Sequence, residues 1–186
     1  MVLNFIKSRL AAFRNDESGT VMVETVIVLP MLFWVVAASY EFFEVHRYNS
    51  ARDKATYTVA DMISREMSTV DANYMDNTKT LFDSITNDDG DTQLRVSVIL
   101  YDADEAKYNV KWSEVRGEGR LISLTTSAIE SEGDNFPMMG DGEEVIIVET
   151  VSDYPALFNV GLSDDLEIET RVFTSPRFAP QIVWEN

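Results

Sequence analysis

Twenty consecutive residues near the amino terminus, from Val21 to Tyr40 (VMVETVIVLPMLFWVVAASY), contain a single charged side chain, Glu24. A helix of about 20 apolar residues spans the hydrocarbon core of a bilayer, which is roughly 30 Å thick. The sequence therefore predicts a transmembrane segment over residues 20–40. Trp34 and Tyr40 lie toward its far end, and Tyr40 suits the aromatic belt at a membrane–water interface.

Charge is divided unevenly between the two sides of this segment. Residues 1–19 carry three basic and two acidic side chains, a net charge of +1. The other 167 residues carry 12 basic and 30 acidic side chains, a net charge of −18. Because basic residues stay on the cytoplasmic side of a membrane helix, we expect residues 1–19 on the cytoplasmic side of the inner membrane and the acidic body exported. Such an acidic body also argues against nucleic-acid binding, which needs a basic face.

Two other structures are compatible with an apolar segment of this kind. One is a buried core helix, although the length and the near-absence of charge favour lipid. The other is a secretory signal peptide, with Ala37-Ala38-Ser39 imitating its cleavage site. A signal peptide has a shorter apolar core of about 7–15 residues, and the helical pattern here continues past this point. We therefore favour the membrane span.

The residues that follow the span keep the period of a helix. Between Pro30 and Gly90 there is no Gly or Pro. Apolar side chains recur there at spacings of three and four, at Tyr48, Ala51, Ala55, Val59, Met62, Ile63 and Met67. This stripe predicts that the membrane helix continues to about Met67, roughly 70 Å from Thr20 at 1.5 Å per residue. We assign residues 41–69 to this extension.

Residues 70–186 form the predicted exported domain. A second helix is expected over Ala72–Thr86, with Asp71 as its N-cap. One face of this helix carries Tyr74, Thr78, Leu81, Phe82 and Ile85. Residues 121–129 suggest a short helix, and residues 133–142 suggest a loop.

Four segments of the same domain have the pattern of strands. Alternating side chains at 94–101 and 108–113 predict an antiparallel hairpin. Residues 144–151 are apolar on both faces, as in a central strand, and residues 166–172 alternate again. The predicted fold class is α+β: a long N-terminal helix, first transmembrane and then amphipathic, packed on an antiparallel sheet of about four strands.

Few residues in this chain suggest catalysis or ligand binding. There is no Cys, and we assign no role to the one histidine, His46, because a lone His is most often a surface side chain. The acidic clusters at 87–91 and 141–144 lack the ligand spacing of an EF-hand Ca²⁺ loop. We therefore interpret them as plain turns, with a Ca²⁺ site as the alternative. Nothing singles out a catalytic pair of carboxylates. We therefore expect no enzyme activity, no cofactor and no metal.

The presence of a charged residue, Glu24, within the apolar segment needs an explanation. A carboxylate within a membrane helix costs roughly 2.5–3.5 kcal/mol at the bilayer centre and less near its edge, so such a group is a functional candidate. The alternative is that Glu24 is solvated at headgroup level. Its surroundings favour a function, because Gly19 directly precedes the apolar run and Glu24 is the fifth residue after it.

The block Gly19-Thr20-Val21-Met22-Val23-Glu24, preceded by basic residues, resembles the prepilin processing motif of type IV pilins and their relatives. The resemblance implies that a membrane-bound prepilin peptidase cuts after Gly19, so that Thr20 carries a new amine. It also implies that Glu24 of one subunit neutralises the Thr20 amine of its neighbour and sets the axial register between them. Each group would be too costly to bury alone.

A narrower resemblance is to the TadE-type proteins of the Tad (tight adherence) pilus system. It is carried by Arg14-Asn15-Asp16-Glu17-Ser18-Gly19, Val23-Glu24, Leu29-Pro30, Tyr40-Glu41-Phe42, Asn49, Ala51 and Arg52. It covers residues about 14–60, whereas residues 90–186 resemble the family only loosely. A major Flp pilin is far shorter and has Tyr after the Glu, where this chain has Thr25. Both differences favour a minor pilin or pseudopilin.

Three functions are therefore weighed. The first is a processed minor pilin or pseudopilin, assembled with other pilin subunits and the Tad machinery by helix packing, for adhesion or surface attachment. The second is an uncleaved single-pass assembly factor of the inner membrane, in which Glu24 faces a partner. The third is an anchored enzyme or ligand-binding module, for which the sequence supplies no convergent polar site.

Overall fold

The computed structural model describes residues 2–14, 18–88, 91–132, 136–158, 161 and 166–185. Parts of two predicted loops, residues 89–90 and 133–135, lie outside these ranges. The helices are α1 (Val2–Arg14), α2 (Ser18–Ser64), α3 (Ala72–Thr86) and α4 (Thr126–Glu132). The strands are β1 (Gln93–Asp102), β2 (Lys107–Arg116), β3 (Glu144–Asp153) and β4 (Glu167–Thr174). Helix α1 was not anticipated from the sequence.

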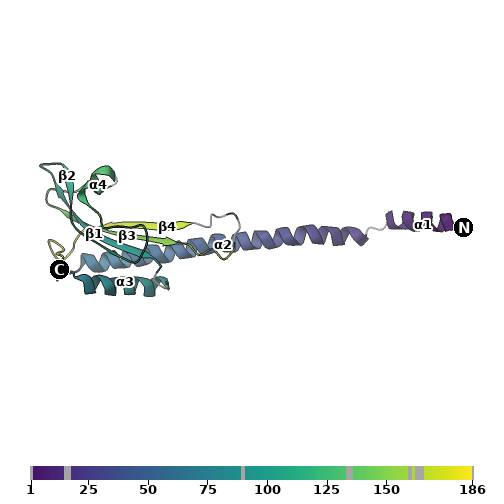
Figure 1. The fold of residues 1–186 in the computed structure, drawn as a ribbon, viewed down its shortest axis with the longest axis horizontal. Coiled ribbons are helices and arrows are strands. Elements are labelled where there is room, and N and C mark those ends of the chain that lie inside the picture. Colours follow the sequence, from purple (N-terminus) through teal and green to yellow (C-terminus); the bar gives the residue numbers. More distant parts are fainter. Residues whose placement is uncertain are drawn as a thin grey trace.

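The long helix α2 has two halves of opposite character. Its first half projects from the rest of the chain, and the sheet domain lies along its second half (Figure 1). Residues 19–36 are all exposed, and an 18-residue window of the helix has a mean hydropathy of 2.3 with none of it buried. That exposure excludes the buried core helix. A single membrane span and a signal sequence both remain compatible with α2.

The second half of α2 buries the stripe that the sequence predicts. Ala55, Val59 and Ile63 are fully buried against the domain. This pattern arises because residues three and four apart lie on one side of a helix. The packing holds α2 against α3, β3 and β4.

Helix α2 ends at Ser64, short of the predicted end near Met67, so that expectation was wrong. The Glu66 carboxylate accepts hydrogen bonds from the backbone N–H groups of Met67 and Ser68, both at 3.1 Å. The Ser64 carbonyl accepts a bond from the backbone N–H of Arg177 at 2.7 Å. Because these bonds close the helix end, Met67 lies outside it and is 76% exposed.

Helix α3 begins and ends where the sequence predicts. The Asp71 side chain accepts a hydrogen bond from the Tyr74 N–H at 2.7 Å, which satisfies an amide of the first turn. Asn87 adopts the left-handed conformation at the other end. The buried face is slightly rotated from the predicted one. Met75, Thr78 and Phe82 are buried, whereas Leu81 and Ile85 are each 39% exposed.

The four strands form one antiparallel sheet in the order β2-β1-β3-β4. This confirms the predicted hairpin, the interior position of residues 144–151 and the fourth strand. Strand β3 is buried from Glu144 to Ser152, as expected for a strand with neighbours on both edges and layers on both faces. The β1–β2 register shifts between Val98 and Ile99.

Each face of the sheet contributes to a separate apolar cluster. Against α2 and α3, the sheet packs Leu94, Val96, Val98, Ile146, Val148 and Val172. On the opposite face, Ile99, Val145 and Ile147 pack with Leu124, Ile129 and Phe136 from α4 and the segments beside it. This second face also buries the Glu149 carboxylate between Arg95 and Arg171, at 2.6 and 2.8 Å.

Helix α4 lies later in the chain than the predicted helix over 121–129. The N–H of Leu121 donates to Gln93 Oε1 and the N–H of Leu124 donates to Ser113 Oγ, both at 2.7 Å. These bonds to strand side chains hold residues 121–125 out of a helix. Thr125 then caps α4 through its hydroxyl, which accepts from the Ala128 N–H at 3.3 Å.

Candidate functional site

The residues of the predicted processing motif lie in the first two turns of α2. Gly19, Thr20 and Glu24 are all exposed, on the half of the helix that projects from the domain. Thr20 and Glu24 are four residues apart, so their side chains lie on the same side of the helix. Residues 19–36 are all exposed, so the sheet domain does not cover this end of α2.

The fold gives no packing reason for a glycine at position 19. A Cβ built there meets no atom within 4 Å. Alanine is more favourable than glycine in a helix, by up to about 1 kcal/mol in its interior. The small size of Gly19 therefore fits recognition by another protein better than a demand of this fold.

Glu24 forms no ion pair with any cation in the described part of the chain. It is the one charged side chain of the apolar surface that runs from Val21 to Tyr40. Its neighbour Thr25 bonds back to the helix, with its hydroxyl donating to the Val21 carbonyl at 2.7 Å. Glu24 thus presents a carboxylate to whatever surrounds this half of α2.

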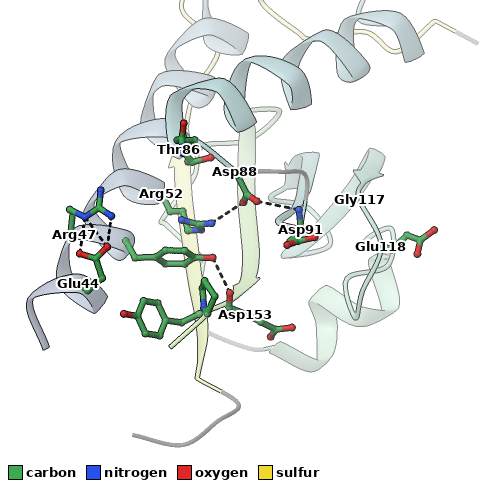
Figure 2. A pocket seen from close by; sticks show the side chains of 13 residues that line it. Glu44, Arg47, Arg52, Thr86, Asp88, Asp91, Gly117, Glu118 and Asp153 are labelled. Carbon is green, nitrogen blue, oxygen red and sulfur yellow. Dashed lines mark hydrogen bonds and ion pairs between the residues drawn. The ribbon is translucent and has the colours of Figure 1, made fainter. Parts of the chain in front are cut away.

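A polar pocket of about 870 Å³ lies on the domain, between α2, the α3–β1 connection and the end of β3 (Figure 2). Five of its lining residues are acidic and two are arginines. Both arginines are engaged: Arg47 pairs with Glu44, and Arg52 pairs with Asp88. The pocket is therefore negative overall, and its two guanidinium groups are already matched by carboxylates.

Arg52 is the buried arginine of this pocket, and it joins three elements. Its side chain is 3% exposed and donates to Asp88 at 2.8 Å, to Ser152 Oγ on β3 at 2.7 Å and to Thr92 Oγ1 at 3.3 Å. Its guanidinium carbon lies 3.2 Å from the centre of the Tyr48 ring. Burial lowers the pKa of Arg52, and the charge of Asp88 opposes that shift. These contacts indicate a structural role, namely fixing the domain on α2.

A second buried charge lies where α2 enters the domain. Glu41 is 0% exposed, and it accepts hydrogen bonds from the Tyr154 hydroxyl at 2.7 Å and from the backbone N–H of Phe158. Burial, reinforced by the Glu41 carboxylate, raises the pKa of Tyr154. The Phe158 ring meets Tyr40 edge-on, with 6.0 Å between ring centres. Residues 154–158, just after β3, are thereby tied to α2.

Replacing Tyr154 with Phe is expected to destabilise the domain by about 1–3 kcal/mol, because the buried Glu41 carboxylate loses a donor. The measurement is guanidinium unfolding of the full chain in detergent, followed by tryptophan fluorescence, to which the domain contributes the neighbouring rings of Trp112 and Trp184. Tyr57→Phe is the matched control, since Tyr57 is 64% exposed and should show no change. Equal unfolding midpoints for the two variants would contradict a stabilising Glu41–Tyr154 contact.

The other candidates of the sequence have ordinary surroundings. His46 is exposed and stacks edge-on against Phe42, with ring centres 4.7 Å apart. In the acidic clusters, Asp88 pairs with Arg52, and Glu144 pairs with Lys111 at 2.5 Å. Within the described residues, no group of three His, Asp or Glu side chains is placed to hold a metal ion.

The sequence alone indicates no physical role for Glu41 or Arg52. In the sequence they are only points of resemblance to TadE-type proteins. Their partners are distant in the chain: Glu41 bonds residues 113 and 117 positions away, and Arg52 bonds residues up to 100 positions away. The available signal was weak. It consisted of a carboxylate and a guanidinium on the side of α2 that carries the apolar stripe.

The long apolar N-terminal helix packed on a four-stranded antiparallel sheet is a pilin-like architecture. Comparison with protein-family models, with curated proteins and with solved structures finds no match to this chain. The pilin-like class of this protein is therefore defined by its fold, together with the exposed apolar half of α2.

Proposed function

We propose that this protein is a minor pilin or pseudopilin of a Tad-type pilus. In this proposal a prepilin peptidase removes residues 1–19, and the chain assembles with other pilin subunits and the Tad machinery by packing of α2. It acts as a structural subunit rather than as an enzyme, and it needs no cofactor. The observation that carries the proposal is the exposed apolar half of α2, with Gly19, Thr20 and Glu24 at its start.

The chemistry of assembly follows from the exposure of this surface. Residues 19–36 bury nothing within the chain, so they require lipid before assembly and neighbouring helices afterwards. Among packed helices, water is excluded and an unpaired Glu24 would be costly. A Thr20 amine created by cleavage would supply the missing positive charge on an adjacent subunit. The acidic domain, anchored on the second half of α2, would be displayed outside the inner membrane.

The mass of the mature amino terminus tests this proposal. In cells with an active prepilin peptidase, we expect a chain that begins at Thr20. Gly19→Leu should instead leave a chain retaining residues 1–19, because a bulky side chain would not fit a site that accepts glycine. Gly140→Leu is the matched control in the exported domain and should be processed normally. A wild-type chain that still begins at Met1 would refute processing.

One observation favours a second candidate, an uncleaved single-pass assembly factor. Helix α1 precedes the span, and its side chains from Ile6 to Arg14 are all exposed, so it could contact a cytoplasmic partner. Processing would discard this helix. Cell fractionation distinguishes the two functions: a pilin occurs in sheared filaments, whereas an assembly factor stays in the inner membrane.

A further inference from the structure

An apolar band surrounds the point where α2 meets the sheet domain. Five exposed apolar side chains form it, and we call them the apolar collar: Tyr40 (47% exposed), Phe42 (58%), Phe43 (70%), Leu157 (67%) and Phe158 (44%). The first three lie on α2 and point to different sides, because successive residues are about 100° apart around a helix. The last two come from the connection after β3.

Contacts within the chain place both parts of the collar at the same height along α2. The Phe158 ring lies 6.0 Å from the Tyr40 ring, and the Phe158 N–H bonds to Glu41. Figure 1 shows that the start of β4 is at the end of the sheet that lies toward the projecting half of α2. Leu157 and Phe158 therefore extend the apolar surface of the helix sideways.

The collar carries no exposed carboxylate among its described residues. Glu41 is the acidic residue within this part of α2, and its burial against Tyr154 and Phe158 removes its charge from the surface. One turn further on, the surface becomes charged, with Glu44 and Arg47 paired on the outside of the helix. The change from apolar to charged thus occurs within a single turn.

The collar also lies at the height expected for the membrane–water interface on the exported side of the span. Twenty residues separate Thr20 from Tyr40, about 30 Å of helix, which matches the bilayer core. Aromatic and leucine side chains are the types that bury into the headgroup boundary. The collar is continuous with the exposed apolar surface of residues 19–36.

We propose that the apolar collar docks in the lipid headgroup boundary, with Leu157 and Phe158 as a second membrane contact beside α2. This inference rests on the proposed membrane span and adds an orientation to it. A single helix leaves a domain free to tilt and rotate over the bilayer, whereas two contacts hold one face of the domain toward the lipid. The hydrogen bonds of Glu41 to Tyr154 and Phe158 hold Leu157 and Phe158 level with Tyr40 on α2.

The test uses spin labels on the full chain, which contains no cysteine of its own. Leu157→Cys carries the probe, and the protein is placed in nanodiscs of phosphatidylcholine and phosphatidylglycerol. Collision of the label with oxygen, which concentrates in lipid, is compared with collision with a water-soluble nickel chelate. We expect the oxygen-to-chelate ratio to be several-fold higher at position 157 than at Met138→Cys. Met138 is a fully exposed apolar residue outside the collar.

A label at Val28→Cys separates the failure of this inference from the failure of the span. If position 28 is in lipid but position 157 matches position 138, the collar does not touch the membrane and the inference is wrong. If position 157 is shielded from both reagents, protein rather than lipid covers it, and the inference is again wrong. If positions 28 and 157 both match position 138, the membrane span itself fails, and the proposed function fails with it.

Discussion

Replacing Glu24 with Ala is expected to leave membrane insertion intact and to abolish incorporation into filaments. Insertion should become easier, because removing a carboxylate from the apolar segment saves part of the roughly 2.5–3.5 kcal/mol that a charge costs at the bilayer centre. Assembly should fail because the Thr20 amine of the neighbouring subunit would then be buried without a partner. The measurement is the amount of protein in sheared filaments relative to the amount in the membrane fraction.

Thr25→Ala is the matched control for this variant, since it alters the adjacent exposed residue without changing any charge. It should assemble at the wild-type level. Glu24→Gln keeps the shape of the side chain and removes its charge, so it should resemble Glu24→Ala. If Glu24→Ala reaches filaments as efficiently as the wild type, the pairing of Glu24 with Thr20 is refuted.

Replacing Arg52 with Met is expected to lower the free energy of unfolding of the domain by about 3–5 kcal/mol. The Asp88 carboxylate is 6% exposed and would be left buried without its cation. The bond to Ser152 and the contact with the Tyr48 ring would be lost together. Guanidinium unfolding of the full chain in detergent, followed by tryptophan fluorescence, measures the effect.

Arg47→Met is the matched control, because it makes the same change five residues earlier on α2. The Arg47 side chain is 77% exposed and pairs with Glu44 at the surface, so its loss should leave stability unchanged. Arg52→Lys should fall between the two, since a lysine keeps the charge but cannot donate in several fixed directions. A loss in Arg52→Met no larger than in Arg47→Met would contradict a stabilising role for the buried pair.

Local patterns predicted most of the fold. Helix α3 was predicted with its correct ends because Asp71 caps it through a residue only three positions away. The hairpin of β1 and β2 was predicted because side chains alternate on both sides of a short turn. The errors occurred where distant groups intervene. Arg177 closes α2 at Ser64, and Gln93 and Ser113 hold residues 121–125 out of a helix.

The candidate site divides in the same way. Gly19, Thr20 and Glu24 could be selected from the sequence as candidates because the grounds for proposing them are their spacing and the apolar run that follows. The fold adds that Gly19 has no packing role and that Glu24 is exposed. The collar could not be predicted, because Leu157 and Phe158 reach α2 only when β3 is in place.

The sequence by itself determined that the chain has one long apolar helix and an acidic α+β domain, because hydrophobic period and charge are properties of neighbouring residues. Only the tertiary structure decided which charges are buried. Glu41 and Arg52 are charged residues of one helix, and only their place on the side with the apolar stripe, a weak signal, distinguishes them from the exposed Arg47. They are buried because residues distant in the chain supply hydrogen bonds that offset the loss of hydration: Tyr154, Phe158, Asp88 and Ser152.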